Sequence, residues 1–226
     1  MLREVVADVW VIESAFEKVG IDFGARMTIV RRKNGELFAY APFAISDEEA
    51  MAIRSLGEVR DIVAPNAAHF MEIREFTSRF PDATLWTLPE IDKRVDGLRY
   101  QHLESLPERW KEDFEGLLVD GLYGFREWVF LHRASRSLIV TDLGFHLPKP
   151  QKPLARIAFR LNGVTRRFGT TRFVRHLIRL GKKDKVRENI RIILGWDFER
   201  IIAGHGFIEE SRAKQKLRTA YSFLDV

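Results

Sequence analysis

Residues Glu127–His146, EWVFLHRASRSLIVTDLGFH, contain the pattern that decides the fold. Two short runs, 128–132 and 138–142, are joined by residues 133–137, which predicts a β-hairpin. The second run begins with three apolar residues, as is typical of a strand covered on both faces. It ends in Asp142, and ligands in layered α/β folds gather where strands end. We therefore expect Asp142 to lie at a functional site.

The rest of the chain predicts an α/β fold. Asn34-Gly35 between two apolar runs indicates another hairpin, because Asn-Gly is a strong turn signal. Ser46 followed by Glu49 predicts a helix that starts with a capping box. Further strands are expected at 4–12, 59–63, 84–87, 114–119 and 201–203, and further helices up to Phe80 and over 209–224.

Composition limits the protein's class. Its 226 residues allow one large domain or two small ones, and we expect a single domain over 1–226. No run of about 18 apolar residues occurs, so no membrane span is expected. The acidic N-terminus does not resemble a signal peptide, and the absence of cysteine fits a cytoplasmic protein. Without cysteine, a metal would have to bind His, Asp, Glu or Asn.

Basic residues are concentrated in one segment. The segment from Lys149 to Arg191 contains fourteen Lys and Arg residues and only two acidic residues. That local excess of twelve, set against a total of +5, leaves the rest of the chain at −7. Such asymmetry indicates an anionic partner, for which Arg166, Arg167, Lys182 and Lys183 are candidates. The alternative is a solvated helical insertion over 148–194 that covers a sheet edge.

Three residues share one sequence context, because each follows a short apolar strand. They are His69, Asp142 and His205. If the strands have the same polarity, these side chains converge at one edge. Two imidazoles and a carboxylate are a common ligand set for Zn²⁺, Fe²⁺ or Mn²⁺. Taken singly, a histidine after a strand is better explained by a structural or capping role; three such residues in matching contexts explain a site equally well.

The chain resembles the metallo-β-lactamase-like hydrolase superfamily, and more closely an uncharacterised branch of it, known only as a domain of unknown function, with degenerate metal motifs. The resemblance covers about residues 3 to 210. Its most specific pieces are the segments Trp196–Gly206 and Ser135–Asp142. It implies a four-layer αββα sandwich with a basic helical insertion at 148–194.

Carried over residue by residue, the superfamily motif is only partly present. The signature His-x-His-x-Asp-His falls on residues 64–69, where only the final histidine, His69, is kept and Asn66 replaces the second. The bridging aspartate matches Asp142 and the terminal histidine matches His205. The ligands of the first metal are absent, and Ala68 removes one ligand of the second. The resemblance therefore implies at most one metal, bound by His69, Asp142 and His205.

Two functional hypotheses follow. The first is a metal-dependent hydrolase-like enzyme with one Zn, Fe or Mn ion, an unknown small-molecule substrate and Asp142 as a catalytic residue. The second is a metal-free, non-catalytic descendant that binds a partner, for example an anionic one through the basic segment. A nucleic-acid or lipid-surface binder is a third class.

Other polar residues are candidate contributors to the site. Asn66, Glu72 and His146 are candidates for lining it. A solvated helix glutamate is the favoured explanation of Glu72, and a loop histidine explains His146 equally simply. Glu127 opens an apolar strand, and both a buried hydrogen-bonding role and a position facing the site are consistent with that pattern.

Overall fold

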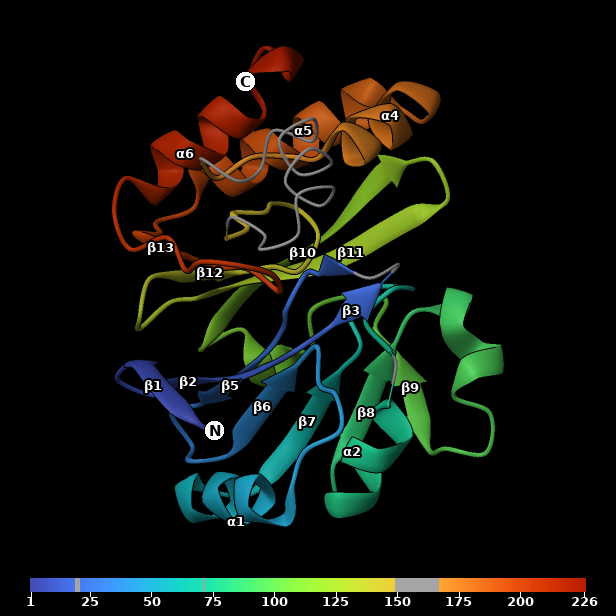
Figure 1. The fold of residues 1–226 in the computed structure, drawn as a ribbon, viewed down its shortest axis with the longest axis vertical. Coiled ribbons are helices and arrows are strands. Elements are labelled where there is room, and N and C mark those ends of the chain that lie inside the picture. Colours follow the sequence, from blue (N-terminus) through green and yellow to red (C-terminus); the bar gives the residue numbers. More distant parts are fainter. Residues whose placement is uncertain (19–20, 71, 149–166) are drawn as a thin grey trace. The chain divides into compact units, whose positions relative to one another are not determined.

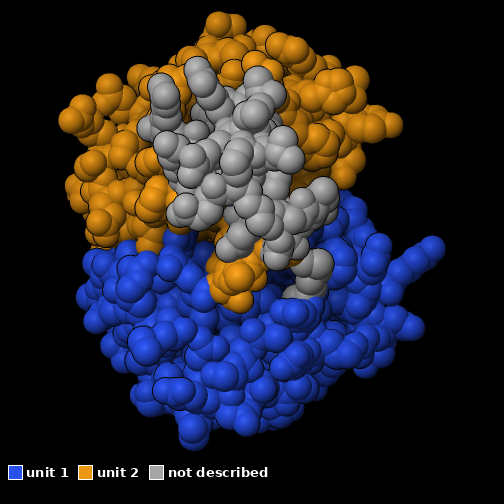
Figure 2. Space-filling view, viewed as in Figure 1, with its two compact units in different colours: residues 1–13, 26–114 blue, residues 14–25, 115–226 orange. Residues whose placement is uncertain are grey.

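The computed structural model describes residues 1–18, 21–70, 72–148 and 167–226. The chain divides into two compact units, coloured separately in Figure 2: residues 1–13 with 26–114, and residues 14–25 with 115–226. No helix among the described residues is long and apolar enough to cross a membrane.

The first unit is built on a mixed sheet, whose strands run in the order β1-β2-β5-β6-β7-β8-β9 (Figure 1). The strands are β1 (Arg3–Val6), β2 (Val9–Ser14), β5 (Ala25–Arg31), β6 (Leu37–Tyr40), β7 (Val59–Val63), β8 (Thr84–Thr87) and β9 (Tyr100–His102). Pairing is antiparallel for β1–β2 and β5–β6 and parallel from β6 to β9. Helices α1 (Asp47–Leu56) and α2 (Ile73–Arg79) connect the parallel strands, with 3₁₀ turns η1 (Pro89–Arg94) and η2 (Glu108–Trp110) later in the chain.

Local sequence signals account for several of these elements. Asn34 and Gly35 form the turn between β5 and β6, with Gly35 at φ +85°. Ser46 and Glu49 form the capping box that was predicted for α1. The single opening strand predicted over 4–12 is wrong: it is the hairpin of β1 and β2, because the chain turns at Asp8, whose φ is 66°.

A buried carboxylate ties the first unit together. Asp61 on β7 is fully buried and accepts hydrogen bonds from the indole N–H groups of Trp86 and Trp110, at 2.8 and 2.9 Å. The guanidinium of Arg109 binds it as well, and that of Arg32 lies 3.1 Å away. A buried charge is tolerated when it is paired and hydrogen-bonded in this way. The cluster therefore holds β7, the strand that leads to His69.

The second unit contains a smaller mixed sheet in the order β10-β11-β12-β13. Its strands are β10 (Phe114–Leu122), β11 (Phe125–His132), β12 (Ser137–Ile139) and β13 (Arg200–Ile202), and a separate ribbon pairs β3 (Glu17–Lys18) with β4 (Ile21–Asp22). Strand β12 is antiparallel to β11, parallel to β13 and buried along its length, as its apolar sequence predicts. The helices are α4 (Arg172–Leu180), α5 (Lys183–Gly195) and α6 (Ala213–Ala220), followed by η3 (Ser222–Leu224).

The described part of the basic segment packs into the core of this unit. Val174 and Ile178 of α4 and Ile190 and Ile193 of α5 are buried in one hydrophobic cluster with strands β11, β12 and β13. Helices α4 and α5 therefore contribute to the hydrophobic core. Residues 149–166 of the predicted insertion lie outside the described residues. The final helix is shorter than the predicted 209–224, since residues 209–212 precede α6.

Candidate metal site

His205 follows β13 and is held in one orientation by the second unit. Its Nδ1 lies 2.5 Å from the carbonyl oxygen of Gly24. A carbonyl only accepts hydrogen bonds, so Nδ1 carries a proton, and in the neutral ring Nε2 then carries the lone pair. The ring is buried and stacks on Phe145, with centroids 5.5 Å apart. Metal-binding histidines are typically fixed through their other nitrogen in this way.

Gly206 allows the chain to pass close to the segment that carries Phe145. It has φ +77°, and a Cβ atom at this position would lie 2.1 Å from the carbonyl oxygen of His146. Residues 146 and 206 form a parallel bridge, and the N–H of Phe207 donates to the His146 carbonyl at 2.8 Å. Only glycine fits here without displacing the backbone, so this glycine sets the position of His205.

Asp142 is positioned by the buried carboxylate of Glu127. The backbone N–H groups of Thr141 and Asp142 donate to the two oxygens of that carboxylate, the second at 2.9 Å. Glu127 lies on β11 and is 2% exposed. Backbone donors bound to a carboxylate make strong, charge-assisted hydrogen bonds. Glu127 therefore fixes the turn that follows β12.

A second buried group holds the same turn. The Tyr221 hydroxyl donates to the Leu143 carbonyl at 2.7 Å. Burial raises the pKa of the Tyr221 hydroxyl well above its usual range, and the charge of Glu127 raises it further. The hydroxyl therefore stays protonated and remains a donor.

His69 is presented by the loop between β7 and α2. The side-chain oxygen of buried Asn66 accepts from the backbone N–H groups of Ala68 and His69, both at 2.8 Å. An asparagine that bonds to backbone two and three residues onward forms a local turn. Asn66, predicted to line the site, thus shapes the loop that carries His69.

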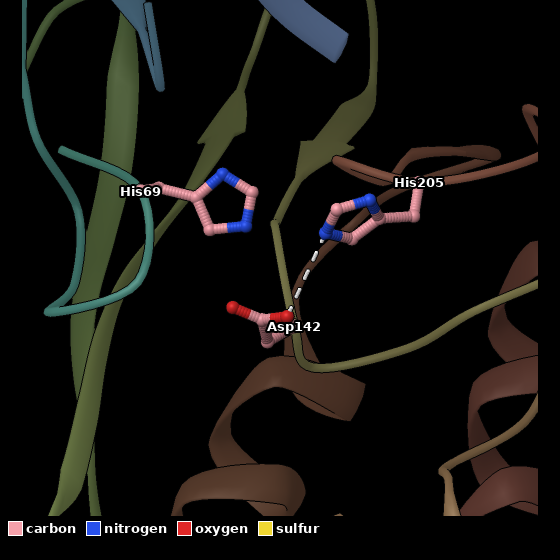
Figure 3. Close-up of side chains that lie close together, drawn as sticks. All are labelled: His69, Asp142 and His205. Atoms are coloured by element: carbon pink, nitrogen blue, oxygen red, sulfur yellow. Dashed lines mark ion pairs between the residues drawn. The ribbon is translucent and has the colours of Figure 1, made fainter. Parts of the chain in front are cut away.

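The three predicted ligands come close together, as Figure 3 shows. His69, Asp142 and His205 each offer one ligand atom, and these atoms all lie within 4.8 Å of one another. Nε2 of His205 lies 3.8 Å from Oδ1 of Asp142. Ligand atoms around a tetrahedral Zn²⁺ with bonds of about 2.0–2.2 Å are separated by about 3.4 Å. The donor types and their closeness mean that this group could hold one divalent ion.

Glu72 and His146 have partners outside this group. The Glu72 side chain accepts from the backbone N–H of Ala44 at 3.2 Å. His146 Nδ1 binds the buried carboxylate of Glu209, which also pairs with Lys216. These contacts give both residues a structural explanation, and their role in lining the site stays a prediction.

The candidate anion-binding residues are only partly described. Arg166 lies outside the described residues. Arg167, Lys182 and Lys183 are exposed. An anionic partner for them remains a prediction.

Comparison with known proteins shows the class of fold. Chains similar across their whole length are metallo-β-lactamases: one from Pontibacter korlensis (13% identity, TM-score 0.63, covering 100% of this chain and 98% of that one) and one from Hirschia baltica (10%, 0.64, 99% and 97%). A third is the metallo-β-lactamase FIM-1 from Pseudomonas aeruginosa in its mono-zinc form (9%, 0.62, 100% and 96%). The protein thus has an α/β metallo-β-lactamase-like fold with two mixed sheets and helices.

A protein-family match covers most of the chain. Residues 7–162 match the model of DUF4336, a domain of unknown function, and the chain belongs to this family. No curated protein matches the chain.

Proposed function

We propose that the protein is a metal-dependent, hydrolase-like enzyme that binds one divalent ion through His69, Asp142 and His205. The observation that carries the proposal is the convergence of these ligand atoms within 4.8 Å, combined with the Nδ1 hydrogen bond that presents Nε2 of His205 as a donor to metal. The mono-zinc form of FIM-1 supports one ion as compatible with this fold.

Each residue has a defined task in this proposal. His69 and His205 would hold the ion through their imidazole rings, and Asp142 would hold it through its carboxylate. When bound, a divalent ion lowers the pKa of a coordinated water towards neutrality and polarises the substrate. The other oxygen of Asp142 is suited to accept a proton from the attacking water. Glu127 keeps that carboxylate in place through the backbone of residues 141 and 142.

The substrate class follows only from charge. The excess of basic residues between Lys149 and Arg191 favours an anionic substrate such as a phosphoester or an acyl group on an acidic carrier. The proposal also includes a single domain with the four-layer αββα arrangement of the superfamily and a cytoplasmic location. The likeness to whole β-lactamase chains supports the layered arrangement.

Elemental analysis of untagged protein tests the metal site. We expect about one equivalent of Zn, Fe or Mn in the wild type and a large loss in Asp142→Ala and His205→Ala. His102→Ala is the matched control, because His102 pairs with Asp92 at 2.8 Å and is not one of the three ligands. Folding of each variant is checked by circular dichroism.

Two results would contradict the proposal. One is the absence of metal in the wild type after reconstitution with each of the three ions. The other is metal that stays in both ligand variants. Stoichiometric metal that depends on both residues would justify a screen of hydrolysable anionic substrates.

A further inference from the structure

Helix α4 presents an outward face on which apolar and basic side chains lie together. Phe173 and Leu180 are 67% and 55% exposed, and they are separated by about two turns of the helix. Arg172, His176 and Arg179 are also exposed. At 3.6 residues per turn these side chains occupy about one third of the helix circumference. We name this surface, together with Tyr123, Lys182 and Lys183, the α4 face.

Helix α4 is held in place by its buried side and by its capped start. The opposite side of the helix buries Val174 and Ile178 in the core, and Thr171 caps the helix start by accepting from the N–H of Val174. At its far end, the turn between β10 and β11 contacts the helix, because the N–H of Tyr123 donates to Leu177 at 3.1 Å (Figure 1). Tyr123 is 64% exposed, so it extends the apolar part of the face.

The cations of the α4 face differ from their neighbours. Lys185 pairs with Asp120 at 2.9 Å, and Arg187 pairs with Asp184. In contrast, four cations form no ion pair with any described residue: Arg172, Arg179, Lys182 and Lys183. Residues 149–166 have no Asp or Glu, so that segment cannot supply an acidic partner. Within the described part of the chain, the charge of this face is therefore not neutralised by an ion pair.

We propose that the α4 face docks on the surface of an anionic lipid bilayer. Large apolar side chains flanked by Arg and Lys are the composition of interfacial membrane-binding helices. Phe173, Leu180 and Tyr123 would enter the boundary between headgroups and acyl chains, while the four cations contact anionic headgroups. Each basic residue near such a surface strengthens binding by about fivefold.

The apolar members of the face favour a bilayer over a nucleic acid. Phosphates of DNA or RNA would bind the cations, and bases would stack on Phe173 or Tyr123. Leu180 is aliphatic and more than half exposed, and it has no comparable partner in a nucleic acid. Lipid gives both kinds of side chain a favourable environment. The charge of the face disfavours a second copy of the chain in the same position, because like charges would meet.

Vesicle co-sedimentation tests this proposal with the full chain. One set of vesicles is pure phosphatidylcholine, and the other contains about one third phosphatidylserine. We expect the protein to sediment with the anionic set and to remain in solution with the neutral set. Raising the salt concentration should weaken the binding, since surface charges are screened.

Paired variants separate the apolar contribution from the charge. Phe173→Gln/Leu180→Gln keeps every charge and should weaken binding at least tenfold, because the inserted apolar area is lost. Arg172→Gln/Arg179→Gln removes two charges and should weaken binding about 25-fold. Ile192→Gln, at a 42% exposed position on α5, and Arg218→Gln on α6 are the matched controls and should bind like the wild type. Circular dichroism confirms that each variant is folded.

Three results would overturn the inference. The first is equal binding, or none, to the two vesicle types. The second is unchanged binding in Phe173→Gln/Leu180→Gln, which would mean general attraction of charge. The third is that the wild type does not bind vesicles but does dimerise, or binds a single-stranded oligonucleotide, and that Phe173→Gln/Leu180→Gln abolishes this association. None of these results depends on the metal content of the protein.

Discussion

The buried Glu127 carboxylate offers a direct test of how the chain holds Asp142. Substitution by Gln keeps the size of the side chain, so no cavity forms. One amide oxygen still accepts a backbone N–H, but the amide NH₂ now faces the second N–H of the pair at residues 141 and 142. The turn therefore loses one charge-assisted hydrogen bond and keeps a weaker, neutral one.

The magnitude can be estimated from these two bonds. A hydrogen bond to a charged group contributes about 1.5–3 kcal/mol, and replacing it by a neutral one costs roughly 1 kcal/mol. Glu127→Gln should therefore lower the free energy of unfolding by about 3 kcal/mol. Residues that orient metal ligands typically change metal affinity by about 10–100-fold. Weaker Zn²⁺ binding of that order is expected as well.

Urea unfolding, followed by tryptophan fluorescence, measures the first effect, and competition with a chromogenic chelator measures the second. Glu115→Gln is the matched control: Glu115 pairs with Arg133 at 3.1 Å with both side chains partly exposed, so solvent screening limits the effect to about 1 kcal/mol or less. If Glu127→Gln is no more destabilising than this control, the carboxylate does not hold the turn. If only the metal affinity is unchanged, Glu127 supports the fold but not the ligand.

Three further substitutions test other contacts. Asp61→Asn should lower the free energy of unfolding by about 3–5 kcal/mol in urea melts, because it removes the charge that buried Arg32 faces; a loss under about 1 kcal/mol would contradict this. Gly206→Ala should cost more than about 2 kcal/mol and reduce metal content, since the positive φ and the His146 carbonyl both oppose a Cβ; full metal content would argue against it. Tyr221→Phe should cost about 1–2 kcal/mol at neutral pH. Because the folded pKa of Tyr221 is raised, its contribution is complete below the unfolded pKa of about 10 and is lost as pH rises through the folded pKa, so the wild type and this variant should converge in strongly alkaline urea melts.

Much of the local structure could be predicted from short-range signals. The Asn34-Gly35 turn and the Ser46–Glu49 capping box depend on residues within a few positions of one another, and both were found. The closeness of His69, Asp142 and His205 also agrees with the structure. Asp142 and His205 follow the paired strands β12 and β13, whereas His69 follows β7 of the other sheet, so only the first two share a sheet edge. Their role as metal ligands stays a prediction.

The role of Glu127 in holding the Asp142 turn depends on the pairing register of strands β11 and β12, which the sequence left undecided. A connection over residues 133–137 would place His132 opposite Leu138. The structure pairs His132 with Ser137, because Arg136 adopts φ 50° and closes a shorter turn. Continuing this register places Glu127 opposite Asp142, where it reaches the backbone of the turn. A shift of one residue thus decides whether the carboxylate supports the site.

The contacts of Tyr221 and Glu209 lay beyond what sequence patterns indicate. Tyr221 reaches Leu143, 78 residues earlier in the chain, and Glu209 reaches His146, 63 residues earlier. Such pairs are set by the packing of α6 and its flanking residues on the sheet, for which no local signal exists. The sequence offered only one comparable indication: Glu127, an acidic residue at the start of an apolar strand.

The hydrogen bonds of Asn66 limit how the loop can be redesigned. Its side-chain oxygen accepts the backbone N–H groups of Ala68 and His69. Asn66→His would remove this acceptor, so the turn would lose both hydrogen bonds even if the new imidazole could bind metal. An attempt to add a metal ligand at position 66 should therefore redesign the turn at residues 66–69 together with that ligand.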